Sequence, residues 1–414
     1  MLMKPGFLTV NAAADLPNNA PVFIPKFCNP AHAKGIKAPG ARKECSIIML
    51  IAIVGLPNKG KSTLFNALTR ANAAVANYPF TTINPNKGVA FASAPCPHLR
   101  IGKPCDPHNA PCEAGVRKIP ANVVDVAGLV EGAHEGRGMG NQFLSDIAGA
   151  DCIIAVADAS GGTDGEGNPC APGSHDAVAD VEVLFKELDY WLAGVLAKNA
   201  AKAKGKGLDF FASQLSGIKI GLVELKAACR KAEISEEKFS DWTKQERLNV
   251  ATQLRTARPT LIAANKIDSE HAAKNIEALK AEFPMPVMPV AADAEVALLK
   301  AAEKKWIEYD GKGFKIIGEN LDQRIIDALR RIDEHVLKRY GSTGVAALAG
   351  ECVFTLMGQI VAYPVEDEVH YCNHFGKVLP DAVLLQKGST ALQMAGRIHT
   401  DLAKGFLYAV DAET

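Results

Sequence analysis

The sequence contains no run of about 18 uncharged apolar residues, the length that a helix needs to cross a bilayer, so we expect no transmembrane helix and no membrane partner. Its first residues lack the apolar stretch of about 7–15 residues behind a basic head that marks a secretory signal. The 10 cysteines are spread over 414 residues, and no two form a C-x-x-C pair. Sparse cysteines of this kind are typical of reduced thiols rather than of a disulfide framework. Together these absences predict a cytoplasmic protein.

The sequence also lacks net charge, with 46 basic and 46 acidic side chains. A net charge of zero argues against a protein that binds a polyanion over its whole surface, so we expect no DNA partner. A local basic patch remains an alternative. Hydrophobic residues make up 48% of the chain, which is ordinary for a globular protein. At roughly 100–200 residues per domain, the length predicts two to four domains. Composition does not fix the oligomeric state.

Residues 1–48 show no sustained hydrophobic period and carry six basic against two acidic residues. One interpretation is a disordered arm. The other is a start of translation placed too early, because Met49 directly precedes a natural first strand. In either case we expect residues 1–48 to lie outside the fold.

Four short apolar runs, at residues 47–54, 122–126, 152–157 and 260–264, predict parallel strands that are buried on both faces. A glycine-containing loop and a helical segment follow the first run. This order predicts an α/β fold with a doubly wound, mostly parallel sheet. Each run ends at a polar or glycine-containing turn, which is where ligands bind in such sheets.

Changes of pattern along the chain predict its domain organisation. The helical, charged stretch at 181–255 predicts an insertion of two long helices joined by a basic loop, in the manner of a coiled-coil arm. It separates two parts of a nucleotide-binding domain, at 49–180 and 256–305. A helical connector is expected at 306–350, and a small β-rich module at 351–414.

The most specific motif is GLPNKGKS at residues 55–62, which fits G-x-x-x-x-G-K-[ST] between a predicted strand and a predicted helix. Glycines let successive backbone N–H groups point at phosphate oxygens, and the helix N-terminus adds partial positive charge. Lys61 would reach the β- and γ-phosphates, and the Ser62 hydroxyl would ligate Mg²⁺. The motif therefore predicts a P-loop NTPase.

Two further motifs follow predicted strands. Asp125 and Gly128 belong to a D-x-x-G sequence, in which the carboxylate would hold Mg²⁺ through water and the glycine N–H would sense the γ-phosphate. Asn265, Lys266 and Asp268 belong to an N-K-x-D sequence. Asp268 could accept two hydrogen bonds from guanine, whereas adenine presents the opposite pattern. A solvated loop at a helix entry is the alternative for the second motif.

Together these residues resemble the translational-type GTPases. The segment NYPFTTINPNKG at 77–88 resembles the first switch of the Obg superfamily, and DVAGLVEGAHEGRGMGNQFL at 125–144 resembles its glycine-rich second switch. The stretch 50–414 resembles the archaeal-type YchF-like branch of that superfamily. HFGKVLP at 374–380 and HTDLAKGFL at 399–407 resemble parts of a TGS domain, which implies a β-grasp-like C-terminal fold.

The resemblance implies a GTP-binding protein with slow, Mg²⁺-dependent hydrolysis that acts as a conformational switch associated with the ribosome or RNA. It implies that Thr82 and Ser62 ligate Mg²⁺, with Asp125 acting through water, and that Lys61, Thr82, Gly128 and Asn58 take part in hydrolysis. The residues expected to bind GTP are Gly55, Pro57, Asn58, Lys59, Gly60, Lys61, Ser62, Thr63, Asp125, Gly128, Asn265, Lys266, Asp268, Ala291 and Ala292.

The hydrolytic residues depart from the commonest GTPase pattern. Leu129 stands where many GTPases have a glutamine that orients the attacking water, so hydrolysis must use another group. Asn58 matches the asparagine that helps to hold K⁺ in potassium-activated relatives, and such a cation would stabilise charge that develops on the phosphates. For His134 we favour an exposed switch residue, and a side chain that orients the attacking water is the alternative.

Three other departures concern the base and the C-terminal module. The better-studied YchF proteins have a degenerate base motif and prefer ATP, whereas the intact motif here favours GTP. The loop behind the base lacks its usual serine, so Ala291 and Ala292 would offer backbone N–H groups. Family members continue beyond position 414, so we expect a truncated TGS module with an exposed sheet edge. The net acidic charge of 351–414 weakens the case for RNA binding.

Five soft ligands, Cys96, His98, Cys105, His108 and Cys112, fall between the first switch and Asp125. Zn²⁺ would accept four of them in a tetrahedron. Because their spacing is irregular and no C-x-x-C pair occurs, we favour a proline-rich loop with reduced cysteines, and a zinc site is the alternative.

Three functions stay open: a GTP hydrolase, an ATP-preferring hydrolase of the same family, and a non-catalytic, nucleotide-gated scaffold for RNA or the ribosome. The two strand-end motifs disfavour a P-loop metabolic kinase.

Overall fold

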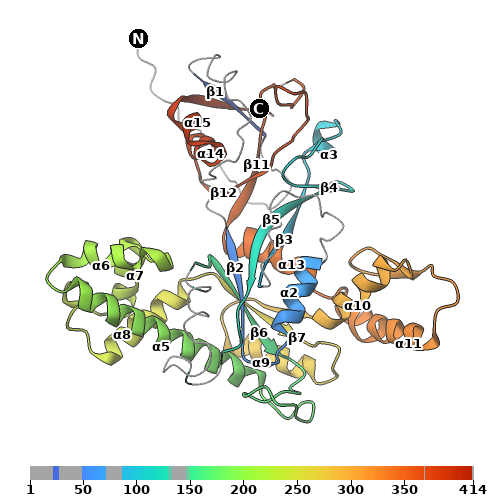
Figure 1. The fold of residues 1–414 in the computed structure, drawn as a ribbon, viewed down its shortest axis with the longest axis horizontal. Coiled ribbons are helices and arrows are strands. Elements are labelled where there is room, and N and C mark those ends of the chain that lie inside the picture. The colour runs from blue at the N-terminus through green and yellow to red at the C-terminus, as the bar shows by residue number, and fades with distance from the viewer. Residues whose placement is uncertain are drawn as a thin grey trace.

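The computed structural model describes residues 22–27, 49–70, 86–129, 132, 147, 149–367 and 369–412. These residues form a central α/β domain, a helical insertion that extends from one side of it, and a C-terminal module above it (Figure 1). Thr82 and His134 lie outside the described residues, so their expected roles stay predictions.

The central sheet confirms the predicted α/β fold. Its strand order is β3-β5-β2-β6-β7-β8, and β4 also pairs with β5. Every neighbouring pair from β5 to β8 is parallel, and β3 is antiparallel to β5. The strands are β2 (Leu50–Val54), β3 (Lys87–Pro95), β4 (Cys112–Glu113), β5 (Val116–Asp125), β6 (Cys152–Asp158), β7 (Thr260–Asn265) and β8 (Val287–Val290). Each of the four apolar runs forms one of these strands.

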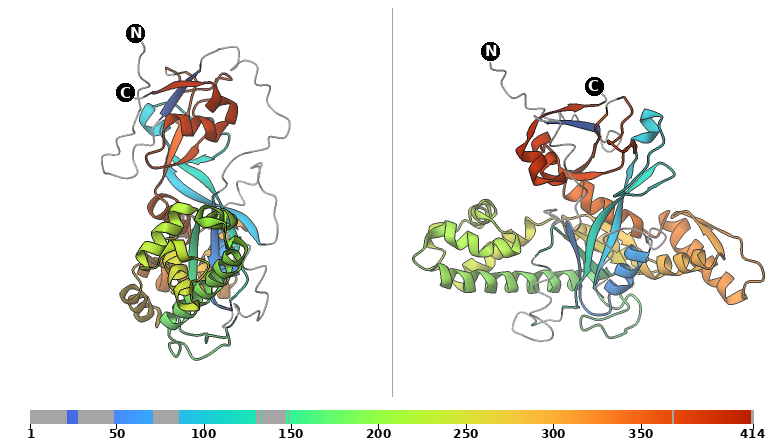
Figure 2. Two further views of the ribbon diagram at one scale, coloured as in Figure 1. Left: turned by 90° about the vertical axis from the view of Figure 1, so that its left-hand side faces the viewer. Right: turned by 45° about the horizontal axis from the view of Figure 1, so that its top comes forward.

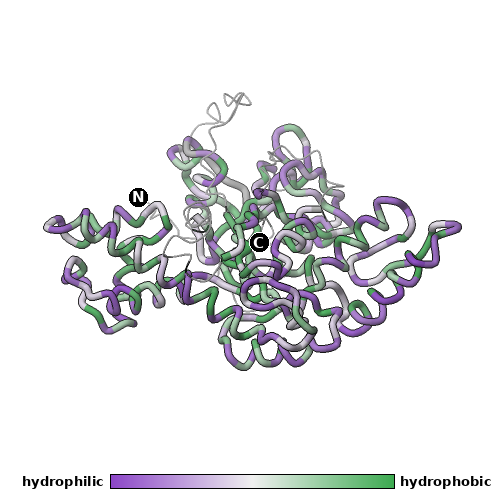
Figure 3. Tube along the Cα trace, turned by 60° about the horizontal axis from the view of Figure 1, so that its bottom comes forward, coloured by the Kyte–Doolittle hydropathy of each residue, from purple (hydrophilic) through white to green (hydrophobic). Residues whose placement is uncertain are grey.

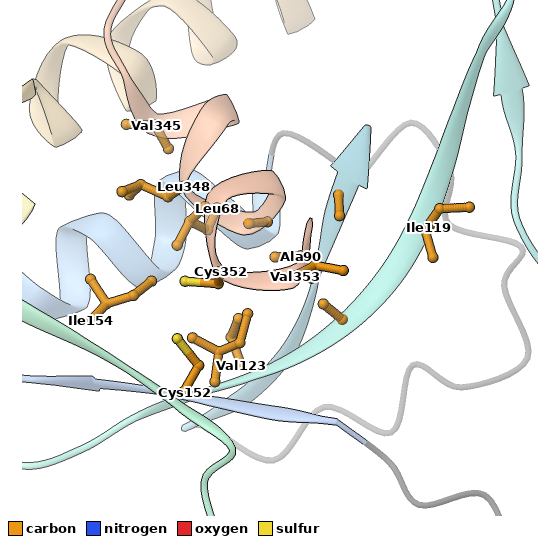
Figure 4. Close-up of a cluster of buried hydrophobic side chains, with 14 of the residues drawn as sticks. Leu68, Ala90, Ile119, Val123, Cys152, Ile154, Val345, Leu348, Cys352 and Val353 are labelled. Carbon is orange, nitrogen blue, oxygen red and sulfur yellow. The ribbon is translucent and has the colours of Figure 1, made fainter. Parts of the chain in front are cut away.

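Helices cover both faces of the central sheet. On one face, α2 (Lys61–Arg70), α13 (Val345–Gly350) and the helical turns Glu351–Leu356 pack on β2, β5 and β6. Figure 4 shows Leu348, Cys352 and Val353 facing Val123, Cys152 and Ile154 of the sheet. On the other face, α9 (Ala272–Glu282), α10 (Ala292–Glu303) and the first turns of α5 (Ala177–Ala203) bury a second core.

The helical insertion has four α-helices, so the prediction of two long helices in a coiled-coil arm is wrong. They are α5 (Ala177–Ala203), α6 (Gly207–Leu215), α7 (Leu222–Lys231) and α8 (Lys244–Thr256). Glycines at 205, 207, 217 and 221 break the pattern and allow two short helices to fold back on α5 and α8. A separate core, in which Phe211 stacks on Phe239 at 4.5 Å between ring centroids, holds the bundle together. Figure 2 shows the bundle projecting from the sheet.

The connector is not helical at its start, where we expected a helix from residue 306. A hairpin of β9 (Ile307–Tyr309) and β10 (Phe314–Ile316) comes first, and α11 (Gln323–Ile332), the helical segment Asp333–Leu337 and α12 (Lys338–Tyr340) follow. The Asp310 carboxylate accepts hydrogen bonds from the backbone N–H groups of Lys312 and Gly313, and these bonds close the turn between the two strands.

The C-terminal module is a four-stranded sheet, with the order β12-β11-β1-β13, covered by two short helices, and its strand β1 (Val22–Phe27) comes from the N-terminal segment. Its elements are β11 (Gln359–Pro364), β12 (Val383–Gln386), α14 (Ala391–Ile398), α15 (Thr400–Lys404) and β13 (Phe406–Asp411). Residues 351–356, expected to belong to this module, instead pack on the central domain. Within the described residues β13 lies at the edge of the sheet.

The strand β1 (Val22–Phe27) comes from the N-terminal segment, so the expectation that all of residues 1–48 lie outside the fold is wrong. It runs parallel to β11 and antiparallel to β13. The prediction failed because the partners of β1 are more than 300 residues away and Pro25 interrupts its pattern.

Hydrophobic segments concentrate in the middle of the molecule, whereas the outer turns of the helical insertion and of the connector are largely hydrophilic (Figure 3). None of the described helices is both long and apolar enough to span a bilayer.

Candidate nucleotide-binding site

The three sequence motifs meet at the carboxyl ends of neighbouring parallel strands. The phosphate loop follows β2, the D-x-x-G turn follows β5, and the N-K-x-D turn follows β7. Since β2 lies between β5 and β6, and β7 is next to β6, the sheet order places all three turns along one edge. Helix α2 begins at Lys61, so its N-terminus faces the same place.

Two glycines of this site allow close approaches that a side chain would block. Gly60 has φ 94°, in the region that favours glycine, and a β carbon there would collide with the Asn265 amide. A β carbon at Gly128 would lie 3.2 Å from both Lys61 Nζ and the Cα atom of Pro57. The D-x-x-G turn therefore rests directly against the phosphate loop.

Lys61 is buried with its amine inside the loop. The Nζ atom donates to the carbonyl oxygen of Leu56 at 2.7 Å, and the residue is 7% exposed. Burial lowers the pKa of Lys61 to about 8, although the nearby carboxylate of Asp125 opposes this shift. A phosphate group is the natural partner for an amine held in this way, because it would supply the missing negative charge.

Asp125 and Ser62 fit the expected Mg²⁺ site. Ser62 hydrogen-bonds to the Asp125 carboxyl group, while burial raises the pKa of that carboxyl. The Oδ1 atom of Asp125 is buried and has no hydrogen-bond partner among the described residues. A buried oxygen without a partner, beside a hydroxyl and a phosphate loop, suits a hard cation that prefers oxygen ligands.

Asn265 joins the phosphate loop to the loop behind the base. Its Nδ2 atom donates to the carbonyl oxygen of Lys59 at 3.1 Å, and its Oδ1 atom accepts from the N–H group of Ala292 at 3.1 Å. Ala291 is held in turn by a hydrogen bond from its N–H group to the carbonyl oxygen of Thr343. Asp268 is exposed at the end of the same turn, where a base can reach it.

Lys266 is fixed by Asp158, for which the sequence predicted no role. The Lys266 Nζ atom lies 2.8 Å from Asp158 Oδ2 and donates to the carbonyl oxygen of Asn58 at 3.3 Å. Burial favours the neutral acid, but hydrogen bonds from Lys266, Ser160 and Thr163 lower the pKa of Asp158. The polar end of β6, directly after the predicted strand, was the signal that could have identified this residue.

The loop between β6 and α5 covers the phosphate loop. The Lys59 Nζ atom donates to the carbonyl oxygens of Thr163 and Asp164 and forms a buried ion pair with Asp180 at 2.7 Å. The Asn58 Nδ2 atom donates to the carbonyl oxygen of Gly167 at 2.9 Å. Only the backbone of Lys59 therefore remains for a phosphate. No feature of the sequence pointed to Asp180, which lies within a long helix.

Leu129 cannot orient a water molecule in this arrangement. It is 4% exposed, and its N–H group donates to the carbonyl oxygen of Gly55 at 3.1 Å. Its side chain belongs to the core under the sheet rather than to the phosphate site.

Three family models match separate parts of the chain. The model described as a 50S ribosome-binding GTPase matches residues 50–172, and the model described as an Obg-like GTPase YGR210-like, G4 motif-containing domain matches 263–367. A TGS domain model matches 376–413.

Several relatives match along most of their length. The uncharacterized GTP-binding protein MJ1332 of Methanocaldococcus jannaschii is 45% identical over 375 residues, which is 88% of this chain and 93% of the relative. Obg-like ATPase 1 of Gallus gallus is 33% identical over 396 residues, which is 91% of this chain and 85% of the relative. The crystal structure of a GTP-binding protein from Pyrococcus horikoshii OT3 aligns with a TM-score of 0.68 and 36% identity, and covers 88% of this chain and 94% of that one.

The fold and the three strand-end motifs define a P-loop nucleotide-binding protein of the GTPase class, with a C-terminal TGS domain. Within this class the chain belongs to the YchF-like branch of the Obg superfamily.

Proposed function

We propose that the protein binds GTP and GDP and hydrolyses GTP slowly in a Mg²⁺-dependent reaction, and that it acts in the cytoplasm as a conformational switch associated with the ribosome. The observation that carries this proposal is the double hydrogen bond of Asn265, which joins the phosphate loop to the loop behind the base. A nucleotide in the site would contact both parts, so its binding would stabilise them together.

Guanine is the favoured base because of Asp268. Its exposed carboxylate is acceptor-only when ionised, and guanine offers two donors on its Watson–Crick edge. Adenine would place an acceptor against this carboxylate and leave a polar group unpaired, which is the strong kind of discrimination. Preference for ATP is the second candidate, since relatives at about one-third identity carry the name Obg-like ATPase 1.

Slow hydrolysis follows from the lack of a water-orienting side chain at position 129. The loop N–H groups, Lys61 and the N–H group of Gly128 would hold the phosphates. These donors and the ammonium group would then stabilise the negative charge that develops on the phosphate oxygens during the reaction. Mg²⁺ held by Ser62, and through water by Asp125, would neutralise the β- and γ-phosphates. Thr82 is expected to complete this set. A non-catalytic scaffold is the alternative, which a turnover measurement with purified protein decides.

The proposal of a ribosomal partner is supported by the match of residues 50–172 to the model of a 50S ribosome-binding GTPase family. A nucleotide switch predicts that association with large ribosomal subunits differs between a GTP analogue and GDP. Co-sedimentation with purified subunits, with each nucleotide in turn, tests this. If the same amount of protein sediments with the subunits in the presence of either nucleotide, ribosome association is not controlled by the nucleotide and the proposed switch is wrong.

Nucleotide titration tests the choice of base. We expect GDP and GTP to bind at least about 100-fold more tightly than ADP and ATP. Asp268→Asn should shift the preference toward xanthine nucleotides, whose ring presents the complementary acceptor. Asp241→Asn, an exposed aspartate in the helical insertion, is the matched control and should change neither preference. Equal affinity of the unmutated protein for GTP and ATP would overturn the proposal of guanine specificity.

A further inference from the structure

Four of the five soft ligands that the sequence places after the first switch come together in space. The ligand atoms of Cys96, His98, Cys105 and Cys112 all lie within 4.8 Å of one another. They come from the end of β3, the short helix α3 (His98–Ile101), the loop after it, and β4. His108 is not part of the group, because its Nδ1 atom pairs with Asp381 at 3.1 Å.

Three of the distances within this group are close to those of a tetrahedral zinc site. Zn–S bonds of about 2.3 Å and Zn–N bonds of about 2.0–2.1 Å place two sulfur ligands about 3.8 Å apart, and a sulfur and a nitrogen ligand about 3.5 Å apart. Here Cys96 Sγ and Cys105 Sγ are 3.9 Å apart. His98 Nδ1 lies 3.3 Å from Cys105 Sγ and 3.5 Å from Cys112 Sγ.

The separation of the sulfurs also argues against a disulfide. An S–S bond is about 2.05 Å long, and all three cysteines have free thiols in this structure. A group of three thiols and one imidazole around a common centre is the donor set of a Cys₃His zinc site.

A buried arginine beside the group gives a second, independent indication. Arg117 is fully buried, and its Nη1 atom lies 3.8 Å from Cys96 Sγ. It has no ion-pair partner among the described residues, and its Nε atom has no hydrogen-bond partner there. A buried charge is costly unless an opposite charge compensates for it. Three thiolates around Zn²⁺ carry one net negative charge, which would pair with this guanidinium.

We propose that Cys96, His98, Cys105 and Cys112 bind one structural Zn²⁺ ion, and that this site fixes the loop on which the C-terminal module rests. All four ligands are protein side chains, so the site leaves no position for a substrate and is structural rather than catalytic.

The contacts of this loop explain what the metal would stabilise. The N–H groups of Asp106 and His108 donate to the carbonyl oxygens of Val378 and Pro380. Asn109 exchanges two hydrogen bonds with the backbone of Ala382, at 2.7 and 2.9 Å. These residues lie between the second and third cysteine ligands, so zinc would hold both ends of the segment that carries the module.

Arg117 connects the four proposed zinc ligands to the same segment of the C-terminal module, residues 378–382. Its Nη2 atom donates to the carbonyl oxygens of Leu379 and Pro380, at 2.5 and 3.1 Å. The guanidinium also lies 5.3 Å from the ring centroid of Tyr363 on β11. Figure 1 shows α3 and β4 beside the C-terminal module, at the far ends of β3 and β5.

Metal analysis of the purified full-length protein tests the proposal. The unmutated chain should retain about one zinc per chain after gel filtration. Substitution with Co²⁺ should give the visible absorption bands of a tetrahedral thiolate site. Cys105→Ser and Cys112→Ser should lower the bound zinc at least about tenfold, because a hydroxyl is a poor replacement for a thiolate.

Two matched controls should keep full zinc content. His108→Ala removes the histidine of the same loop that lies outside the group, and Cys170→Ser removes a half-buried cysteine of another loop. Protein that contains no zinc and takes up no Co²⁺ with tetrahedral bands would overturn the proposal. A Cys96–Cys105 disulfide, found by mass spectrometry of the untreated chain, would overturn it as well. The Co²⁺ measurement needs no variant, so it decides the matter even where a cysteine variant fails to fold.

Discussion

The side-chain amide of Asn265 lies between two parts of the nucleotide site that are more than 200 residues apart in the sequence, with its Nδ2 atom 3.1 Å from the carbonyl oxygen of Lys59. Its Oδ1 atom accepts from the N–H group of Ala292, and the residue is 1% exposed. Both polar atoms of this side chain are therefore held by backbone groups of the protein. The side chain holds the phosphate loop against β7 and the start of α10.

Removing this amide should weaken nucleotide binding, because it breaks the link between the phosphate loop and the loop behind the base. Asn265→Ala leaves the Lys59 carbonyl and the Ala292 N–H group buried without partners, at a cost of about 1–3 kcal/mol for each group. We expect GDP affinity to fall at least about tenfold, with a lower melting midpoint of the nucleotide-free protein. Isothermal calorimetry and thermal unfolding measure the two effects. Asn199→Ala, in the helical insertion, is the control and should leave GDP affinity unchanged. Unchanged affinity of Asn265→Ala would contradict the bridging role.

Lys61 and Ser62 are neighbours in the phosphate loop with different expected roles. Lys61→Ala should abolish tight binding of the triphosphate, because it removes the cation that meets the β- and γ-phosphates. Ser62→Ala should chiefly weaken the dependence of triphosphate binding on Mg²⁺, because it removes an oxygen ligand. Titrating a GTP analogue with and without Mg²⁺ separates the two effects. Full affinity of Lys61→Ala would show that the phosphates bind elsewhere.

The buried pair of Lys59 and Asp180 should matter for stability. Both side chains are at most 2% exposed, and their charged atoms are 2.7 Å apart. Removing one partner of a buried ion pair leaves the other charge buried without that partner, which costs about 3–5 kcal/mol of folding stability. We therefore expect Lys59→Met or Asp180→Leu alone to lower the melting midpoint more than the double variant does.

An exposed ion pair supplies the comparison for that measurement. Lys280 and Glu277 lie 2.9 Å apart on α9 with side chains that are 47% and 73% exposed. Lys280→Ala should change the free energy of unfolding by at most about 1 kcal/mol. If the double variant of Lys59 and Asp180 is no more stable than either single variant, the loss of stability does not come from an uncompensated buried charge.

The sequence predicted the central domain better than the parts around it, for physical reasons. Parallel strands buried on both faces need continuous apolar runs, and the runs at 152–157 and 260–264 became β6 and β7. The edge strand β3 consists largely of small residues and gave no comparable signal. The three motifs could be recognised because phosphate and base chemistry dictate their spacing, and the sheet order places their turns along one edge. Lys59 was assigned to the nucleotide, whereas its buried partner Asp180 shows that its side chain serves the loop after β6.

The N-terminal strand should stabilise the C-terminal module. Because β1 lies between β11 and β13, its removal leaves without partners the backbone N–H and C=O groups of these strands that pair with it. We expect deletion of residues 1–48 to accelerate amide hydrogen exchange in β11 and β13, as measured by mass spectrometry. Deletion of residues 1–20, which spares β1, is the control and should leave this exchange unchanged. Equal protection in both deletions would mean that β1 contributes nothing to the module.

The proposed role of K⁺ depends on the conformation of Asn58. Its φ of 57° lies in the left-handed region, which asparagine and glycine tolerate better than other residues. The Nδ2 atom donates to the carbonyl oxygen of Gly167 at 2.9 Å, which fixes the orientation of the amide. The Oδ1 atom of this exposed residue remains available as a ligand for a monovalent cation beside the phosphates.

GTP hydrolysis should therefore rise when K⁺ replaces Na⁺ at constant ionic strength, since an added positive charge matters most as charge develops between the β- and γ-phosphates. Asn58→Gly should remove this rise, because it deletes the amide without straining the left-handed backbone, and Asn58→Asp should keep part of it because a carboxylate oxygen remains. GDP affinity should stay close to that of the unmutated protein in both variants, because the backbone cradle of the loop persists. Turnover measured in the two salts distinguishes these outcomes from a purely structural effect, which would lower turnover equally in both. Identical turnover of the unmutated protein in K⁺ and Na⁺ would exclude the cation and leave the water to be oriented by His134 or by a residue of the ribosome.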